Sequence, residues 1–471
     1  MRFVTLALAG AIFLASAATA AAQTPIINDP FSSPVVGQHK TAVEPDTFAF
    51  GSTIVASAQI GRIFDGGAAG IGWATSTNNG ATWVEGTLPA LTKAAGGPWD
   101  RATDPSVAYD RRHNVWLIST LVLTNTASGP SGRAVLTSRS TDGGLTWGSP
   151  VNTAVAASNQ DFDKNWITCD NTTTSPYYGS CYTQFDDHAN GNALKMSYSR
   201  DGGATWAASS VPRVGVIGGQ PLVLPNGNVV VPLDNAYETA LGYTVSTNGG
   251  VKFGTAFSIT SISAADDPGN IRSGPLPSAE IAGGKIWVVW EDCRFRTNCS
   301  SNDIVYTTST NGTTWSAVKR IPIDPVTSTV DHLIPGVAVA GSTGNIASVT
   351  YYYFPVTNCG TSCSLYVGHV STTNGGTSWS TPTQVAGPMS MSWIPDTTQG
   401  RMVGDYISSS FGSDGNAHPA FAVASAPSSG VFAQPVFTAS LAATGGGVAQ
   451  SSDAVVFEGS AAHASAPFSR H

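Results

Sequence analysis

The stretch Ser140-Thr141-Asp142-Gly143-Gly144-Leu145-Thr146-Trp147 indicates a tight turn between two β-strands. An Asp side chain in such a turn accepts hydrogen bonds from the backbone that follows it, and Gly adopts a positive φ without steric penalty. The closing Trp can pack beneath the hairpin. Short alternating segments flank the turn, at residues 134–137 and 149–151, and such segments are typical of strands.

The same turn pattern occurs six times, at intervals of roughly 60 residues, which is somewhat longer than a minimal four-stranded propeller blade. The other copies begin at Ser76, Ser199, Ser246, Ser309 and Thr372. Seven apolar opening strands repeat with these turns, and several enter through a proline, as at Asp104-Pro105, where no ladder hydrogen bond is needed. We predict an all-β fold, a seven-bladed β-propeller of four-stranded antiparallel blades, with six blades as the alternative.

The chain is expected to form one propeller domain over residues 23–441. A closed ring removes open sheet edges, so the last blade should take a strand from around residues 25–36. Arg2, the apolar stretch after it and the small residues up to Ala22 predict a signal peptide over residues 1–22. Residues 442–471 form an Ala/Gly/Ser-rich tail, with one extra strand expected at residues 454–457.

The composition excludes several classes of protein. The chain has 471 residues, a net charge of −8 and 11% charged residues. Its Lys and Arg residues form no basic run, so no nucleic-acid partner is expected. No apolar run of about 18 residues follows the signal peptide, so no membrane association is expected. We predict a secreted monomer, extracellular or periplasmic.

The six cysteines form three local pairs, which in an exported chain are most simply disulfides. The pairs are Cys169 with Cys181, Cys293 with Cys299, and Cys359 with Cys363. Zinc is the weaker alternative, because no CxxC occurs and the pairs are far apart. No cofactor is expected, except that Asp186-Asp187-His188 could hold a structural calcium ion.

The six turn motifs resemble the Asp-box, or BNR repeat, of the sialidase superfamily. The resemblance covers most of the mature chain and implies a β-propeller whose Asp-boxes lie on the blade periphery, away from the substrate pocket. Sialidases carry three arginines for the substrate carboxylate, a Tyr–Glu nucleophile pair and an Asp acid/base. The segment Gly61-Arg62-Ile63-Phe64 lacks the proline of their Phe-Arg-Ile-Pro-like segment, so we place the chain in the superfamily but not among strict sialidases.

Ligands of related propellers bind around the central channel, where the innermost strands begin. The spacing of the repeats places Asp, Arg, Lys, His and Tyr side chains at these strand entries. They form either a functional cluster or a plug of charges that pair with one another. For hydrolysis, Tyr406 is the candidate nucleophile and Asp104 or Asp163 the candidate acid. For β-elimination, His332 or Tyr406 is the candidate base. The candidate substrate-binding residues are Arg272, Arg401, Lys164, Gln220 and Asp405.

Arg294 belongs to a second dense polar stretch, Asp292-Cys293-Arg294-Phe295-Arg296. It could bind an acid group at the rim, or it could belong to a clipped surface loop. The function predicted from these residues and the resemblance is cleavage of glycosidic linkages in an acidic, sialate- or uronate-containing glycan, as a sialidase-like exo-glycosidase. A polysaccharide lyase that acts on a uronate and a non-catalytic glycan-binding propeller are the alternatives, and in each case the partner is an acidic oligo- or polysaccharide.

Overall fold

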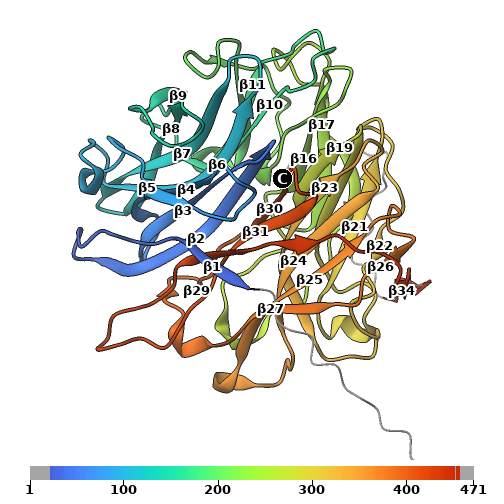
Figure 1. Cartoon of the computed structure of the whole chain (residues 1–471). Coiled ribbons are helices and arrows are strands. Elements are labelled where there is room, and N and C mark those ends of the chain that lie inside the picture. The colour runs from blue at the N-terminus through green and yellow to red at the C-terminus, as the bar shows by residue number, and fades with distance from the viewer. Residues whose placement is uncertain (1–21, 451, 457–471) are drawn as a thin grey trace, which may run out of the picture.

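The computed structural model describes residues 22–450 and 452–456, so all but the last residue of the predicted signal peptide lie outside it. The described chain is built from antiparallel strands (Figure 1), which confirms the all-β prediction. Its helical segments are short 3-10 turns: η1 (Lys93–Ala95), η2 (His188–Asn190), η3 (Pro268–Asn270), η4 (Thr297–Cys299), η5 (Gly360–Ser362) and η6 (Met391–Trp393). Over the same residues, no helix is long and apolar enough to cross a bilayer.

The first two four-stranded units belong to one continuous sheet. The first unit contains β2 (Gly37–Phe50), β3 (Thr53–Ile63), β4 (Ala68–Ser76) and β5 (Val84–Thr87). The second contains β6 (Arg101–Asp110), β7 (Val115–Thr126), β8 (Gly129–Ser140) and β9 (Val151–Val155). The two are joined where β4 pairs with β6, at Ala68 and Ala102.

Four separate antiparallel sheets follow along the chain. The third unit contains β10 (Phe162–Cys169), β11 (Cys181–Asp187), β12 (Ala193–Ser199) and β13 (Ala207–Ala208). The fourth contains β14 (Val216–Gly219), β15 (Leu222–Val223), β16 (Val229–Asn235), β17 (Ala240–Ser246) and β18 (Phe257–Ser261). The fifth contains β19 (Ser278–Ala282), β20 (Lys285–Asp292), β21 (Asp303–Ser309) and β22 (Lys319–Arg320). The sixth contains β23 (Asp331–Ala340), β24 (Ile346–Phe354), β25 (Ser364–Thr372) and β27 (Thr383–Ser390).

The last sheet combines both ends of the chain. It contains β30 (Ser408–Phe411), β31 (Asn416–Ala422), β32 (Val436–Ala439) and β33 (Leu441–Ala442), and β1 (Gln23–Ile27) pairs antiparallel with β32. Figure 1 shows the blue first strand beside the red last strands. The predicted N-terminal strand is therefore present, although it is shorter than residues 25–36 and begins earlier. A small hairpin of β28 (Asp396–Thr397) and β29 (Gly400–Arg401) precedes this sheet.

All six turn motifs adopt the same hydrogen-bonding pattern. In the second copy, Gly144 N donates to Ser140 Oγ (2.9 Å) and Thr146 N donates to Asp142 Oδ1 (3.0 Å). Equivalent bonds form in the other copies, which join the third strand of a unit to its short outer strand. The hydrogen bonds from Thr146 hold the pKa of Asp142 at about 2. These residues are thus occupied in shaping the turn.

The last glycine of the turn is required for close packing between units. A Cβ on Gly144 would lie 2.8 Å from Val55 of the preceding unit, and one on Gly312 would lie 2.3 Å from Val230. Both glycines also have a positive φ. By contrast, a Cβ on Gly143 would meet nothing within 4 Å. The turns therefore act as wedges that set the spacing of neighbouring sheets, which only a residue without a side chain permits.

Polar side chains tie the inner strands of neighbouring units together. Asp46 Oδ2 accepts a hydrogen bond from Val107 N (2.7 Å), and Ser278 Oγ accepts one from Val337 N (3.1 Å). Apolar side chains fill the space between sheets, as where buried Trp287 packs against Trp379. All three predicted disulfides are present. Neighbouring sheets are thus held by both apolar packing and directed hydrogen bonds.

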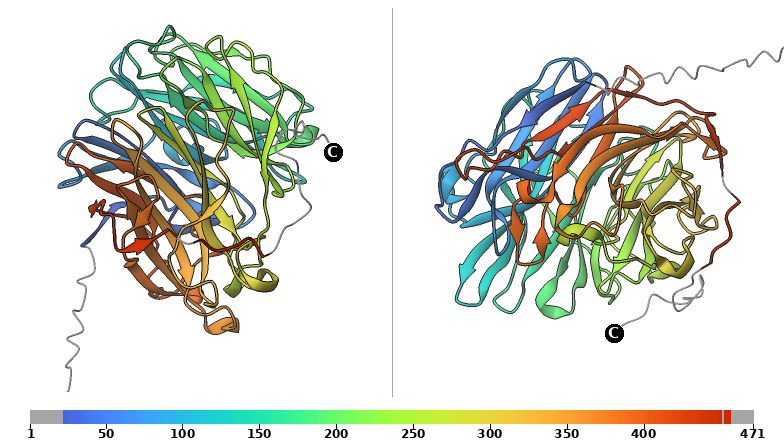
Figure 2. Two further views of the ribbon diagram at one scale, coloured as in Figure 1. Left: turned by 90° about the vertical axis from the view of Figure 1, so that its right-hand side faces the viewer. Right: turned by 90° about the horizontal axis from the view of Figure 1, so that it is seen from below.

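The segment after the last sheet runs back over the outside of the molecule (Figure 2). There β34 (Val448–Ala449) pairs with β26 (Ser378–Trp379) of the sixth unit's outer turn. Asp453 forms an ion pair with Arg320 (3.3 Å). Residues 454–456 form no strand, in contrast to the prediction, and residue 457 lies outside the described part. The tail reaches the preceding sheet through β34 instead.

Candidate functional site

A β-bulge interrupts the innermost strand of the first three units. The pairings of β2 with β3, β6 with β7 and β10 with β11 each shift register near the middle of the strand. The residues inside these shifts have a positive φ of 53° at Glu44, 49° at Asp104 and 52° at Lys164. A side-chain-bearing residue keeps this conformation only where the surrounding fold fixes it. Since bulges re-aim side chains, they explain how three charged residues from three units come to line one cavity.

The cavity has two adjoining parts. Lobe one has a volume of about 270 Å³ and extends from the shared residues to Glu44, Arg62 and Asp104. Lobe two has a volume of about 400 Å³ and extends to Glu238, Gly274 and Asp405. The residues that line both lobes are Asp163, Lys164, His188, Arg272 and Gln399. The two lobes therefore adjoin at a set of charged side chains, and we call them together the groove.

Asp405 is the centre of an ion-pair network in this groove. Lys164 Nζ lies 2.5 Å from Asp405 Oδ2, and Arg272 forms a bidentate pair, with Nε 2.7 Å from Oδ1 and Nη2 bonded to Oδ2. Burial alone would raise the pKa of Asp405, but the charges of Arg272 and Lys164 hold it far below the ordinary value. Asp405 thus stays ionised and fixes both cations beside the groove, and all three residues are among those that the sequence predicted to converge.

Asp104 and Asp163 approach each other at a single backbone group. Lys164 N lies 3.1 Å from Asp104 Oδ2 and 3.0 Å from Asp163 Oδ1. Burial, followed by the nearby charge of Asp104, raises the pKa of Asp163 to about 6. A carboxyl group with a raised pKa beside a second carboxyl group is an arrangement that acid/base catalysis uses. The sequence predicted both residues, and the structure places them side by side in lobe one.

Two residues of lobe one were not selected from the sequence. Buried Arg62 donates to Gly67 O (2.7 Å) and contacts Met402 Sδ (3.0 Å), and it forms no ion pair with any described residue. Burial lowers its pKa to about 10, so it remains charged at neutral pH. Glu44 accepts a hydrogen bond from Gln59, and burial and then the charge of Asp405 raise its pKa well above the ordinary value.

Tyr406 lies beneath the groove, half-buried, with its ring edge-on to Trp166 (5.1 Å between centroids). Its hydroxyl donates to Pro105 O (3.3 Å). Burial and then the charge of Glu44 raise its pKa well above the ordinary value. Tyr406 lines a small cavity of about 40 Å³ together with Asp104 and Lys164. It is therefore adjacent to the acid pair, but its surroundings oppose formation of the phenolate.

Three predicted substrate-binding residues are occupied by structural contacts. Gln220 lines the small cavity under Tyr406 and accepts a hydrogen bond from Ala279 N (2.5 Å). Arg401 donates to Ile394 O (2.6 Å), and its own carbonyl accepts from Arg272 N (2.7 Å), which holds Arg272 in place. Arg294 pairs with Asp292 (2.6 Å) in the loop clipped by a disulfide. Neither Arg401 nor Arg294 lines either lobe.

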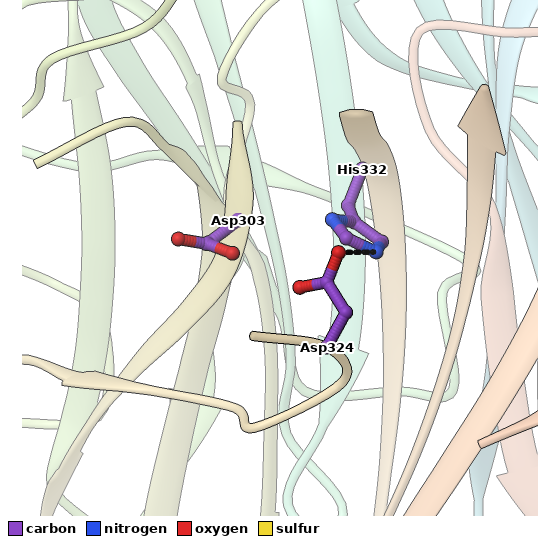
Figure 3. Close-up of side chains that lie close together, drawn as sticks. All are labelled: Asp303, Asp324 and His332. Carbon is purple, nitrogen blue, oxygen red and sulfur yellow. Dashed lines mark ion pairs between the residues drawn. The ribbon is translucent and has the colours of Figure 1, made fainter. Parts of the chain in front are cut away.

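The structure places His332 in a different charged cluster, which we call the Asp303 cluster: Arg296, Asp303, Arg320, Asp324 and His332. Figure 3 shows His332 facing Asp324, with Asp303 on the neighbouring strand. His332 Nε2 is 4.0 Å from Asp324 Oδ2, and Arg296 Nη2 binds both Asp303 (2.5 Å) and Asp324 (2.7 Å). Two guanidinium groups already neutralise the carboxylates, which disfavours a metal ion. His332 lines neither lobe, so it does not converge with the central polar cluster as the sequence predicted.

The predicted calcium residues do not share one face of their strand. Successive residues of a strand point to opposite faces, so Asp186 and Asp187 at the end of β11 diverge. Asp187 accepts a hydrogen bond from Gln160 (2.8 Å), Asp186 accepts one from Asn192 (3.2 Å), and His188 is exposed at the groove. A calcium ion at this stretch remains a prediction without a convergent ligand set.

No family model matches the sequence, and no curated protein matches it. Among solved structures, the endosialidase of phage phi92 superposes with a TM-score of 0.50 at 10% identity, over 90% of this chain and 69% of that chain. The Hadza microbial sialidase Hz136 gives 0.47 at 15% identity, over 67% of this chain and 64% of that chain. A protein of unknown function from Dyadobacter fermentans gives 0.47 at 14% identity, over 74% of this chain and 98% of that chain. At 10% identity the resemblance is one of fold, and the chain has a fold similar to that of the phage phi92 endosialidase.

Proposed function

We propose that the protein is a glycoside hydrolase that cleaves an acidic glycan in the groove made up of lobes one and two. The observation that carries this proposal is the pair formed by Asp104 and Asp163 at Lys164 N, because the raised pKa of Asp163 suits a proton donor. Asp163 protonates the glycosidic oxygen, and Asp104 serves as the second carboxyl group that such hydrolysis needs.

The charges around the pair favour an anionic sugar. Burial raises the pKa of the groove carboxyl groups Glu44, Asp163 and Glu238, which favours their neutral form. Lys164 and Arg272 are paired with Asp405, whereas Arg62 lines lobe one without an ion-pair partner among the described residues. A carboxylate on the substrate would supply that partner.

The position of His332 gives no support to elimination with this residue as base. A lyase would instead require Tyr406 as the base, but burial and then the charge of Glu44 raise the pKa of this residue well above the ordinary value. The remaining alternative is a protein that binds the glycan without cleaving it, and the experiment distinguishes this protein from an enzyme.

The experiment is a screen of sialylated and uronate-containing glycans in mildly acidic buffer, read by new reducing ends and by the ultraviolet absorbance of an unsaturated uronate. We expect reducing ends without the absorbance, and their loss in Asp163→Asn. Asp142→Asn is the matched control, since four of the other turns carry Asn at this position. Absorbance in step with cleavage would contradict hydrolysis, and binding without any product would contradict the enzyme.

We also propose that the four-stranded units close a ring of seven blades, as the repeat count predicts. The pairing of β1 with β32 supports closure. So does the contact that a Cβ on Gly80 of the first unit would make with His418 of the last, at 2.9 Å, since it repeats the wedge between successive units. The three disulfides are compatible with an exported, extracellular protein.

A further inference from the structure

The two lobes of the groove meet at Asp163, the proposed proton donor. Asp163 lines both lobes, so the proposed proton donor lies at their junction and not at the end of either. Lys164 and Arg272 lie at the same junction. A site that removes one terminal sugar needs a pocket on only one side of the donor, whereas this groove offers space on two.

The two lobes differ in what they can hold. Lobe one contains Arg62, a cation that forms no ion pair with a described residue, beside Gly66 and Gly67. Lobe two contains Glu238 and Gly274, and its volume is the larger. Each lobe alone lies near the small end of the range of about 300–1,000 Å³ typical of ligand pockets. Because the two lobes adjoin at five shared residues, their combined volume suits several linked sugars better than a single sugar.

We propose that the enzyme cleaves internal bonds of a polymeric acidic glycan, with lobe one and lobe two holding sugars on opposite sides of the scissile bond. This inference rests on the proposed function and replaces the exo mode expected from the resemblance. In the reaction, the bond between the anomeric carbon and the glycosidic oxygen breaks, and that oxygen takes the proton of Asp163. Water supplies the new oxygen on the anomeric carbon and gives one proton to Asp104. Asp104 then releases this proton to solvent and Asp163 takes one back, so that each cleavage consumes one water molecule and restores both carboxyl groups.

The first test compares product sizes from α2,8-linked polysialic acid and from polygalacturonate. Internal cleavage produces fragments of many lengths early in the reaction and a rapid fall in chain length for few new reducing ends. Release of single terminal residues with the polymer length preserved would overturn the inference while leaving the proposed function intact. Absence of any product from either polymer, or from the terminal sialosides and uronosides of the screen, would overturn both.

The second test obstructs one lobe at a time. Thr398 is exposed and lines only lobe one, so Thr398→Trp narrows that lobe. Gly274 lines only lobe two, and a Cβ there would meet the mobile end of Glu238 at 2.6 Å, so Gly274→Leu fills that lobe without a backbone clash. If sugars occupy both lobes, each variant should lose tenfold or more in polymer cleavage.

Matched controls make the same changes on the outer turns, as Thr377→Trp and Gly148→Leu, at exposed positions outside both lobes. These should retain wild-type cleavage. In Asp163→Asn, calorimetric affinity for oligomers of the cleaved polymer should rise with length until both lobes are filled. Full cleavage by one of the two obstructed variants, or an affinity that no longer rises beyond a disaccharide, would overturn the inference.

Discussion

The groove and the Asp303 cluster are both built from Asp paired with two cations, yet they differ in how completely the charges are neutralised. In the Asp303 cluster, Arg296 and Arg320 share Asp303 and Asp324, and backbone carbonyls such as Pro325 O complete the hydrogen bonds. In the groove, Asp405 takes two cations, while further carboxyl groups have raised pKa values.

The contrast between the two regions shows that buried charge does not by itself mark a functional site. The Asp303 cluster is nearly sealed, with Arg296 fully buried and Asp324 only 14% exposed, so it can do little beyond joining neighbouring sheets. The groove borders open space and retains carboxyl groups that can exchange protons. Open space and incomplete neutralisation together distinguish the site.

The largest predicted effect is on turnover, which should depend on the groove and not on the Asp303 cluster. Asp163→Asn keeps the shape of the side chain but removes the proton donor, so turnover should fall by about 10²–10⁴-fold. Asp303→Asn, in folded protein, should retain activity within a few-fold because Asp303 lines neither lobe. Steady-state kinetics on the substrate found in the screen measures both. Equal losses of turnover in the two variants would contradict the proposed difference between the groove and the Asp303 cluster.

The free energy of unfolding should depend strongly on the Asp303 cluster. Asp303→Ala leaves Arg296 and Arg320 buried with one shared partner fewer, and the free energy of unfolding should fall by about 3–5 kcal/mol. Asp453, whose side chain is 30% exposed at the edge of the same cluster, is the control, and Asp453→Ala should lose less than about 1 kcal/mol. Urea unfolding followed by tryptophan fluorescence measures both. A small loss for Asp303→Ala would show that the cluster does not hold the sheets.

The pH dependence of stability should reveal the proton affinity of Asp163. Its folded-state pKa of about 6 lies above the ordinary value of 3.8, so its contribution to stability is fully present below pH 3.8 and is lost as pH rises through 6. Relative to Asp163→Asn, the wild type should lose about 2–3 kcal/mol between these limits. Unfolding of both proteins across this window tests the sign. A wild type that gains stability relative to the variant as pH rises would contradict the raised pKa.

The smallest effect concerns the wedge glycines, which neither charged region uses. Gly143 and Gly144 both have a positive φ, but only Gly144 faces a neighbour. Gly143→Ala should lose about 1 kcal/mol from backbone strain, and Gly144→Ala about 1–3 kcal/mol more from overpacking against Val55. Thermal unfolding compares the two. Equal losses would mean that the turn does not set the spacing of the sheets.

The fold was predictable because its signal is local. Asp or Asn, Gly and an aromatic residue shape each turn by contacts within the motif, so six copies revealed the repeating units. The convergence of Asp104 and Asp163 was also predictable from the sequence, because each lies where the first strand of a repeating unit begins. The bulges that give Glu44 and Lys164 a positive φ were not, since register depends on the partner strand.

His332 illustrates what the repeat phase could not supply. It begins an inner strand, as Asp163 does, but the side chains of Arg296 and Asp324 come from loops whose paths the repeat does not specify. Arg62 shows the converse. It lies near the end of β3 and not at a strand entry, so the repeat does not select it, although β3 brings it to the wall of lobe one.

The pH dependence of kcat/KM for the cleaved glycan tests the role of the groove most directly. If Asp163 donates the proton, kcat/KM should fall as pH rises through about 6, where that donor ionises. Asp163→Asn should lose this limb along with most of its activity. A wild-type profile that stays flat through that pH, or a variant that keeps the same limb, would contradict the assignment.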